Sequence, residues 1–223
     1  MYEVLGNLLP LALAVSLSPI PIIATVLMLL APRAKLNSVI FLIGWIVAII
    51  VVTSVFTLVA TTFELSDSDD PNPTAGVIRI LLGVGLLALS YRKWTSKPTP
   101  GDDIPLPTWM SSIERSTPGR SLATGLLLAG VNPKNLLLIA GAAVSIGTGG
   151  LSTQETIATI AIFTFLASFT VLLPVVAYAF FHERMDAPLI SVRDWLVRND
   201  SLLMGLLLLI FGFVLIGNGI SSF

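Results

Sequence analysis

The sequence predicts an all-α polytopic membrane protein with six transmembrane helices, and three observations lead to this fold class. Of the 223 residues, 55% are hydrophobic and 11% are charged, far from the averages of soluble proteins. The apolar residues are gathered into long blocks, each close to the length that crosses a hydrocarbon core of roughly 30 Å. The basic residues stand almost entirely between these blocks.

The apolar blocks give six predicted spans. In chain order they cover residues 4–30, 36–62, 75–91, 121–146, 156–181 and 202–220. Of the 12 Lys and Arg residues, all but two fall in the first, third and fifth loops, and the second and fourth loops contain none. The positive-inside rule therefore predicts that both termini lie outside the membrane.

Three spans in each half make the two halves face opposite ways across the membrane, which is the topology of an inverted repeat. We expect residues 1–91 to form the first three-helix repeat and residues 121–223 the second. Residues 92–120 would be a cytoplasmic linker that carries an interfacial helix.

Two weak sequence correspondences support this division. Ser18-Pro19 occupies a position in the first span that corresponds to the position of Asn132-Pro133 in the fourth span. Each pair is followed by an apolar run. Gly83 of the third span likewise corresponds to Gly212 of the sixth.

Both long inner loops contain an apolar edge at helical spacing, which is typical of short helices that lie in the membrane interface. Ordinary anchoring of a loop by tryptophan is the alternative interpretation. The positions concerned are Trp109, Met110 and Ile113 in the third loop and Leu189, Val192, Trp195 and Leu196 in the fifth.

Two spans are expected to be broken near their middle. Pro19 and Pro21 in the first span leave the carbonyls of Val15 and Leu17 without their usual helical donors. Pro133 does the same in the fourth span. Unpaired backbone at membrane depth is tolerated only inside protein or along a watery cavity, so both breaks should point into the helix bundle.

Lys134 directly follows the second break and lies near the centre of its span. A lysine at that depth costs about 2.5 to 3.5 kcal/mol on insertion scales, so it is a functional candidate. Kinked helices with a snorkelling lysine are the alternative. The residues that we expect to bind substrate are Ser18, Pro19, Pro21, Asn132, Pro133, Lys134 and Asn135.

Discontinuous helices at mid-depth often form a transporter site, and the N-termini of the half-helices favour anions. Lys134 would add a full positive charge to such a site. Arg79, by contrast, lies one turn inside the third span, and we expect it to reach lipid head groups.

Composition excludes several other functions. The net charge of −1 provides no basic field for nucleic acid. With no Cys and one His, thiolate metal sites and multi-histidine zinc sites are excluded. No Asp, Glu or His lies inside a predicted span, which argues against a divalent-cation exporter. We expect no cofactor, no metal and no enzymatic activity.

A family resemblance rests on motifs spread over nearly the whole chain. They are Pro107-Thr108-Trp109-Met110-Ser111-Ser112-Ile113, Thr117-Pro118-Gly119-Arg120, Gly125, Asn132-Pro133-Lys134-Asn135-Leu136 and the opening Ser18-Pro19-Ile20-Pro21. Together they resemble the peptidoglycolipid-addressing (sulfolipid-addressing) protein family of the lysine-exporter superfamily. The resemblance implies six helices in two inverted halves, a homodimer as one possible assembly, and movement of lipid-linked envelope molecules across the bacterial inner membrane.

The function expected from residues and resemblance together is a transporter or flippase that exports an anionic or glycosylated envelope lipid, with membrane lipids as its partners. Two alternatives stay open. One is an exporter of amino acids or other small organic anions. The other is a non-transporting scaffold that recruits an envelope-lipid exporter through the inner loops.

Overall fold

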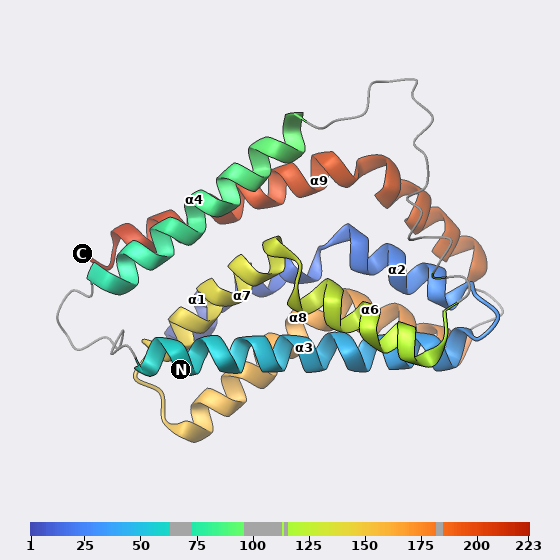
Figure 1. Ribbon diagram of the computed structural model, residues 1–223, viewed down its shortest axis with the longest axis horizontal. Helices are drawn as coiled ribbons and strands as arrows, with labels where there is room; N and C mark the ends of the chain where they lie inside the picture. The colour runs from blue at the N-terminus through green and yellow to red at the C-terminus, as the bar shows by residue number, and fades with distance from the viewer. Residues whose placement is uncertain (63–72, 96–112, 114–115, 182–184) are drawn as a thin grey trace.

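The computed structural model describes residues 1–62, 73–95, 113, 116–181 and 185–223, and every regular element within them is an α-helix (Figure 1). The helices are α1 (Tyr2–Ser16), α2 (Pro19–Leu29), α3 (Ala34–Thr62), α4 (Pro73–Thr95), α6 (Pro118–Gly130), α7 (Pro133–Gly147), α8 (Thr153–Phe181) and α9 (Asp186–Ile220). The predicted all-helical class is confirmed. Trp109 and Met110 lie outside the described residues.

Four helices are long and apolar enough to cross a membrane: α3, α4, α8 and the Ser201–Ile220 part of α9. The pairs α1 with α2 and α6 with α7 pass the same test together, bent by 51° and 60° at short breaks. Counting each bent pair as one span gives up to 6 spans among the described residues. The chain is therefore a multi-pass membrane protein.

Both breaks fall where prolines were expected to interrupt a helix. Ser18 and Asn132 are extended, and Pro19 and Pro133 are the first residues of the helices that follow. Proline suits that position because its missing N–H would have no helical partner there. Pro21 lies in the first turn of α2, so it does not add a second interruption.

The third helices of the two halves, α4 and α9, lie side by side and stand apart from α3 and α6 (Figure 1). Glycines allow α4 and α9 to approach each other this closely. A Cβ atom added to Gly83 would lie 2.7 Å from the carbonyl oxygen of Gly212, and one added to Gly76 would lie 2.8 Å from that of Gly219. Any larger residue would push the two helices apart.

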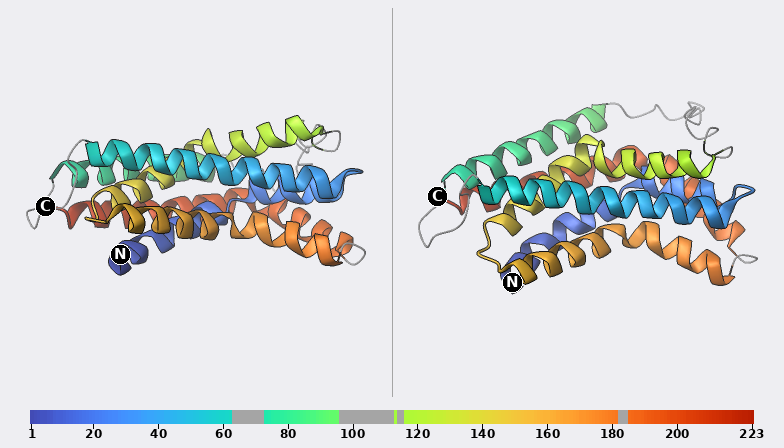
Figure 2. Two further views of the ribbon diagram at one scale, coloured as in Figure 1. Left: turned by 90° about the horizontal axis from the view of Figure 1, so that it is seen from below. Right: turned by 60° about the horizontal axis from the view of Figure 1, so that its bottom comes forward.

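The core lies among α1, α3, α7 and α8, where Phe41, Trp45 and Phe163 are fully buried. The two termini lie at the same end of the molecule in all views (Figures 1 and 2). An even number of membrane crossings requires that arrangement.

The apolar edge of the fifth loop is helical, as predicted, but it is not a separate helix. It is the beginning of α9, which runs without interruption from Asp186. Leu189 and Leu196 are buried, and Leu189 packs with Val26 and Leu29 of α2. Packing on α2 therefore stabilises a helix through the polar stretch that was expected to be loop.

Arg79 has side-chain partners that the sequence did not predict. Its guanidinium donates hydrogen bonds to Thr148 Oγ1 at 2.9 Å and to Ser222 Oγ at 2.6 Å. The side chain therefore joins α4 to the end of α7 and to the C-terminus.

Candidate functional site

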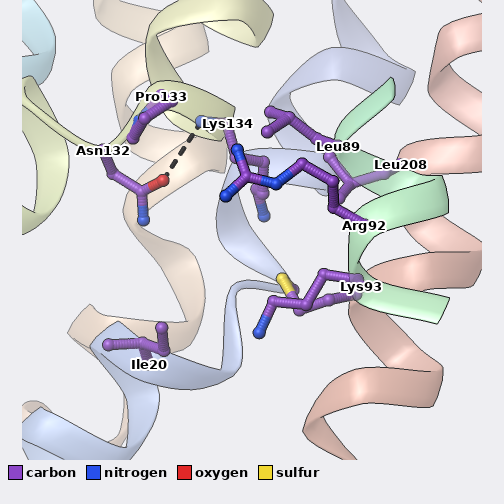
Figure 3. Close-up of a pocket in the computed structure, with 9 residues that line it drawn as sticks. Ile20, Leu89, Arg92, Lys93, Asn132, Pro133, Lys134 and Leu208 are labelled. Atoms are coloured by element: carbon purple, nitrogen blue, oxygen red, sulfur yellow. Dashed lines mark hydrogen bonds between the residues drawn. The ribbon is translucent and has the colours of Figure 1, made fainter. Parts of the chain in front are cut away.

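The start of α7 is built by Asn132. Its extended backbone makes it the N-cap, and its Oδ1 accepts a hydrogen bond from the Lys134 N–H at 3.1 Å (Figure 3). A side-chain oxygen of this kind satisfies one of the N–H groups that a helix start leaves without a partner. The cap fixes Lys134 in the first turn, directly at the break.

Lys134 reaches across the bundle to the other break. The residue is only 6% exposed, and its ammonium donates to the Ala14 carbonyl at 2.7 Å and to Ser18 Oγ at 2.5 Å. In a continuous helix, the Ala14 carbonyl would accept from the Ser18 N–H. Here that N–H donates to the Val15 carbonyl at 3.3 Å instead. The carbonyl left for the lysine is therefore that of Ala14, not those of Val15 and Leu17.

A further pair of hydrogen bonds ties the two breaks together. Ser18 Oγ donates to Asn135 Oδ1 at 3.3 Å, and Asn135 Nδ2 donates to the Leu128 carbonyl at 3.0 Å. Leu128 is in the last turn of α6, where carbonyls lack helical donors. Ser18 and Asn135 are both buried, so this network holds the ends of all four half-helices.

The structure brings together most of the predicted site residues. Ser18, Lys134 and Asn135 form the network above. Asn132, Pro133 and Lys134 line a cavity of about 410 Å³ beside it (Figure 3). Pro19 and Pro21 are buried in α2 and do not line this cavity, although Ile20 between them does.

Residues of α4 and α9 complete this cavity, which we call the central cavity. The residues that we expected to bind substrate all lie in the first and fourth spans. The described lining residues are Ile20, Leu89, Arg92, Lys93, Asn132, Pro133, Lys134, Met204 and Leu208. Sequence reasoning missed Arg92 and Lys93 as cavity residues because it attributed both to membrane orientation. Their position in the last turn of the third span was the available signal.

A second, apolar hollow of about 720 Å³ lies between α2, α8 and the first part of α9. Ile22, Val26, Leu173 and Trp195 are among its lining residues. Thr170 borders it, donates to the Ser16 carbonyl and accepts from Ser16 Oγ at 3.3 Å. Through Thr170, one wall of the hollow is therefore hydrogen-bonded to Ser16 at the end of α1, two residues before Ser18.

The chemistry of the site is that of binding. Cationic, amide and hydroxyl groups gather beside apolar side chains, as in sites that orient a ligand by a few polar contacts. No group of three or more His, Cys, Asp or Glu residues that could hold a metal occurs in the described part of the chain.

Comparison with known families decides the relationship of this chain. The family described as "Sap, sulfolipid-1-addressing protein" matches residues 8–221. The chain belongs to the sulfolipid-1-addressing protein family. Its matched region includes both helix breaks, Lys134 and the residues of α4 and α9 that line the central cavity. Neither the curated proteins nor the solved structures yielded a match. Membership in the sulfolipid-1-addressing family implies a role in the addressing or export of envelope lipids.

Proposed function

We propose that the protein is a transporter or flippase that exports an anionic or glycosylated envelope lipid across the bacterial cytoplasmic membrane. The observation that supports this most is the position of Lys134, which joins two broken helices at the edge of the central cavity. Broken helices around a charged group near the middle of the membrane are a common construction of transporter sites. Family membership supports a lipid cargo.

The proposed mechanism rests on two inverted halves that rock about the site. The contacts of α4 and α9 support this relation. If Gly83 is equivalent to Gly212, then Gly76 is equivalent to Gly205, and Ser90 to Gly219. The Gly76–Gly219 contact then has a counterpart, because Ser90 Oγ donates to the Gly205 carbonyl at 2.7 Å.

The other helices support the same relation. Both α3 and α8 contain 29 residues, and each follows a bent helix pair. The proposal includes termini on the outer side, a place in the lysine-exporter superfamily and a homodimer as one assembly.

The lining of the central cavity fits the polar part of a lipid. Lys134, with Ser18, Asn132 and Asn135 near it, would hold the head group. Apolar side chains from α4 and α9 would contact the adjoining hydrocarbon, and they are those of Leu89, Met204 and Leu208.

Export of a small organic anion is the second candidate, and the volume of the central cavity favours it. About 410 Å³ lies in the range of small-molecule pockets. A scaffold role predicts that deletion of residues 102–116 abolishes function while changes at Lys134 do not.

Transport by purified protein in vesicles tests the proposal. We expect Lys134→Gln, which keeps a donor but loses the charge, to lower transport of an anionic lipid at least about tenfold, because hydrogen bonds to charged groups contribute roughly 1.5 to 3 kcal/mol. The matched control is Lys35→Gln, since Lys35 is exposed in the first turn of α3. Normal transport by a folded Lys134→Gln variant would refute the assigned site.

A further inference from the structure

We infer that Arg79 is a gate residue, whose hydrogen bonds close the central cavity toward the end of the molecule where both chain termini lie. We call this end the terminal end. The role rests on the proposed transport, because alternating access needs a site that is closed on one side while it is reached from the other. The hydrogen bonds of Arg79 would therefore break in the opposite state of the transport cycle.

Arg79 and the central cavity lie at different levels of α4. Arg79 is in the second turn of this helix, whereas the last turns, with Leu89 and Arg92, line the cavity. An α-helix rises about 1.5 Å per residue, so Arg79 and Arg92 are roughly 20 Å apart along the helix axis. The start of α4 is at the terminal end in all views (Figures 1 and 2).

The side chain of Arg79 joins three segments at the terminal end. Its Nη1 donates to Ser222 Oγ at 2.6 Å, and its Nη2 donates to Thr148 Oγ1 at 2.9 Å. Thr148 is the C-cap of α7 and is buried, and Ser222 follows the end of α9. The donors of a guanidinium have a fixed planar geometry, so both bonds persist only while α4, α7 and the segment after α9 keep this arrangement.

Apolar packing closes the space beside these hydrogen bonds. Ala75 and Ile78 of α4 form a hydrophobic cluster with Ala60 of α3 and Val144 of α7. Gly147 of α7 is so close to α3 that an added Cβ atom would lie 2.7 Å from the Cβ of Ala60. The helices α3, α4 and α7 are therefore in close contact at the level of Arg79.

The central cavity lies on the other side of this packed region. Among the described residues, α7 contributes only its first turn to the lining, with Pro133 and Lys134, and α4 contributes nothing before Leu89. Figure 3 shows Arg92 extending from the last turn of α4 toward the same space. A ligand in the cavity is therefore separated from the terminal end by the contacts around Arg79.

The helix α7 connects the gate to the proposed binding site. It begins at the break, where Lys134 bonds to the first span, and it ends at Thr148, which accepts from Arg79. The helix has 15 residues and contains no proline after Pro133, so it moves as one body. A shift of α7 at the Lys134 end therefore changes the distance between Thr148 and Arg79.

Cysteine labelling in sealed vesicles tests the gate, because the chain contains no Cys of its own. The reporter is Leu89→Cys in the central cavity, and the probe is a membrane-impermeant maleimide added to the side that carries the termini. Tyr2→Cys, at an exposed position near the N-terminus, identifies that side. We expect slow labelling of the Leu89→Cys reporter while Arg79 is present. Arg79→Gln should raise the rate at least about tenfold, because a hydrogen bond to a charged group contributes roughly that factor.

Two further variants separate the hydrogen bonds from the charge. Thr148→Val/Ser222→Ala removes both acceptors and keeps Arg79, so it should also raise the labelling rate. Arg33→Gln removes the same charge from an exposed position and should leave the rate unchanged. Unchanged labelling in Arg79→Gln, or a rise that the acceptor variant does not reproduce, would overturn the inference.

A reporter in the core separates gating from general loosening of the fold. Ala167 is fully buried among the core residues, so Ala167→Cys should stay protected when Arg79→Gln opens the gate. An equal rise at Leu89→Cys and Ala167→Cys would overturn the gate and leave Arg79 a structural residue. If Arg79→Gln fails to fold, Thr148→Val/Ser222→Ala takes its place with the same two reporters.

The labelling needs no transported lipid, so its failure is distinct from failure of the proposed function. Faster labelling in Arg79→Gln, together with normal transport by Lys134→Gln, would refute the assigned binding site and leave the gate standing. Unchanged labelling in Arg79→Gln, together with impaired transport by Lys134→Gln, would refute the gate alone.

Discussion

Lys134 is stabilised by groups that a continuous first span would not offer. The break redirects the Ser18 N–H to Val15, and the Ala14 carbonyl then accepts from the lysine ammonium at 2.7 Å. A buried cation without hydrogen bonds would be costly, so the break and the charge depend on each other. A ligand that attracts Lys134 toward the cavity would also loosen the contact between the two broken helices.

Replacement of Ser18 tests this dependence. Ser18→Ala removes one acceptor of the Lys134 ammonium and the donor to Asn135, and both partners are buried. We expect the variant to lose about 1 to 3 kcal/mol of stability, measured as a lower thermal unfolding midpoint in detergent.

The matched control is Ser191→Ala. Ser191 is exposed, and its hydroxyl bonds only one turn back to the Ala187 carbonyl at 2.9 Å, so its loss should change the midpoint little. Equal midpoints for the Ser18 variant and the wild type would show that the network does not stabilise the break.

Sequence reasoning located much of this site but could not complete it. Lys134 was detectable because a charge at the centre of an apolar run is costly, and Pro19 and Pro133 because proline interrupts helices. The role of the Ala14 carbonyl was not detectable, because it depends on which carbonyl accepts from the Ser18 N–H at the break. Arg92 and Lys93 already had a sufficient explanation in membrane orientation, and only the structure shows that they also line the central cavity.

At the scale of elements, α4 and α9 form one unit through their small residues. The carbonyl of Gly212 would lie 2.7 Å from a Cβ on Gly83, so even one added methyl group requires the helices to separate. The same unit places the basic turn of α4 at the central cavity. Its packing is therefore linked to the geometry of the central cavity.

Substitution in this contact should destabilise the protein. For Gly83→Ala we expect a loss of about 1 to 3 kcal/mol, typical of overpacking, read from the thermal unfolding midpoint. Gly217→Ala on α9 is the control, because nothing lies within 4 Å of its added Cβ. A midpoint lowered equally by both substitutions would argue against a specific α4–α9 contact.

The helices that differ from expectation do so for tertiary reasons. The polar stretch around Arg198 favours a loop by composition, yet α9 continues through it because Leu189 and Leu196 pack inside the protein. Arg79 is bound by Thr148 and Ser222, which come from segments distant in the sequence. Neither outcome depends on local sequence, so neither could be read from one chain.

At the scale of the whole molecule, the central cavity lies between two groups of helices. On one side are the broken helices joined by Lys134, and on the other is the α4–α9 unit that carries Arg92 and Lys93. A change in the distance between the groups would bring these cations together or move them apart. An anion held between them would favour the closer arrangement, which is the differential binding that a transport cycle needs.

Mass spectrometry of lipids that co-purify with the protein tests the anionic-lipid site most directly. Wild type and the Lys134→Gln variant would be isolated from the same membrane, with Arg33→Gln/Lys35→Gln as the charge-matched control. We expect anionic lipids to be enriched over the bulk membrane in wild type and control, and this enrichment to be lost in Lys134→Gln. Lipids in bulk proportions in the wild type, or equal enrichment in Lys134→Gln, would contradict the site.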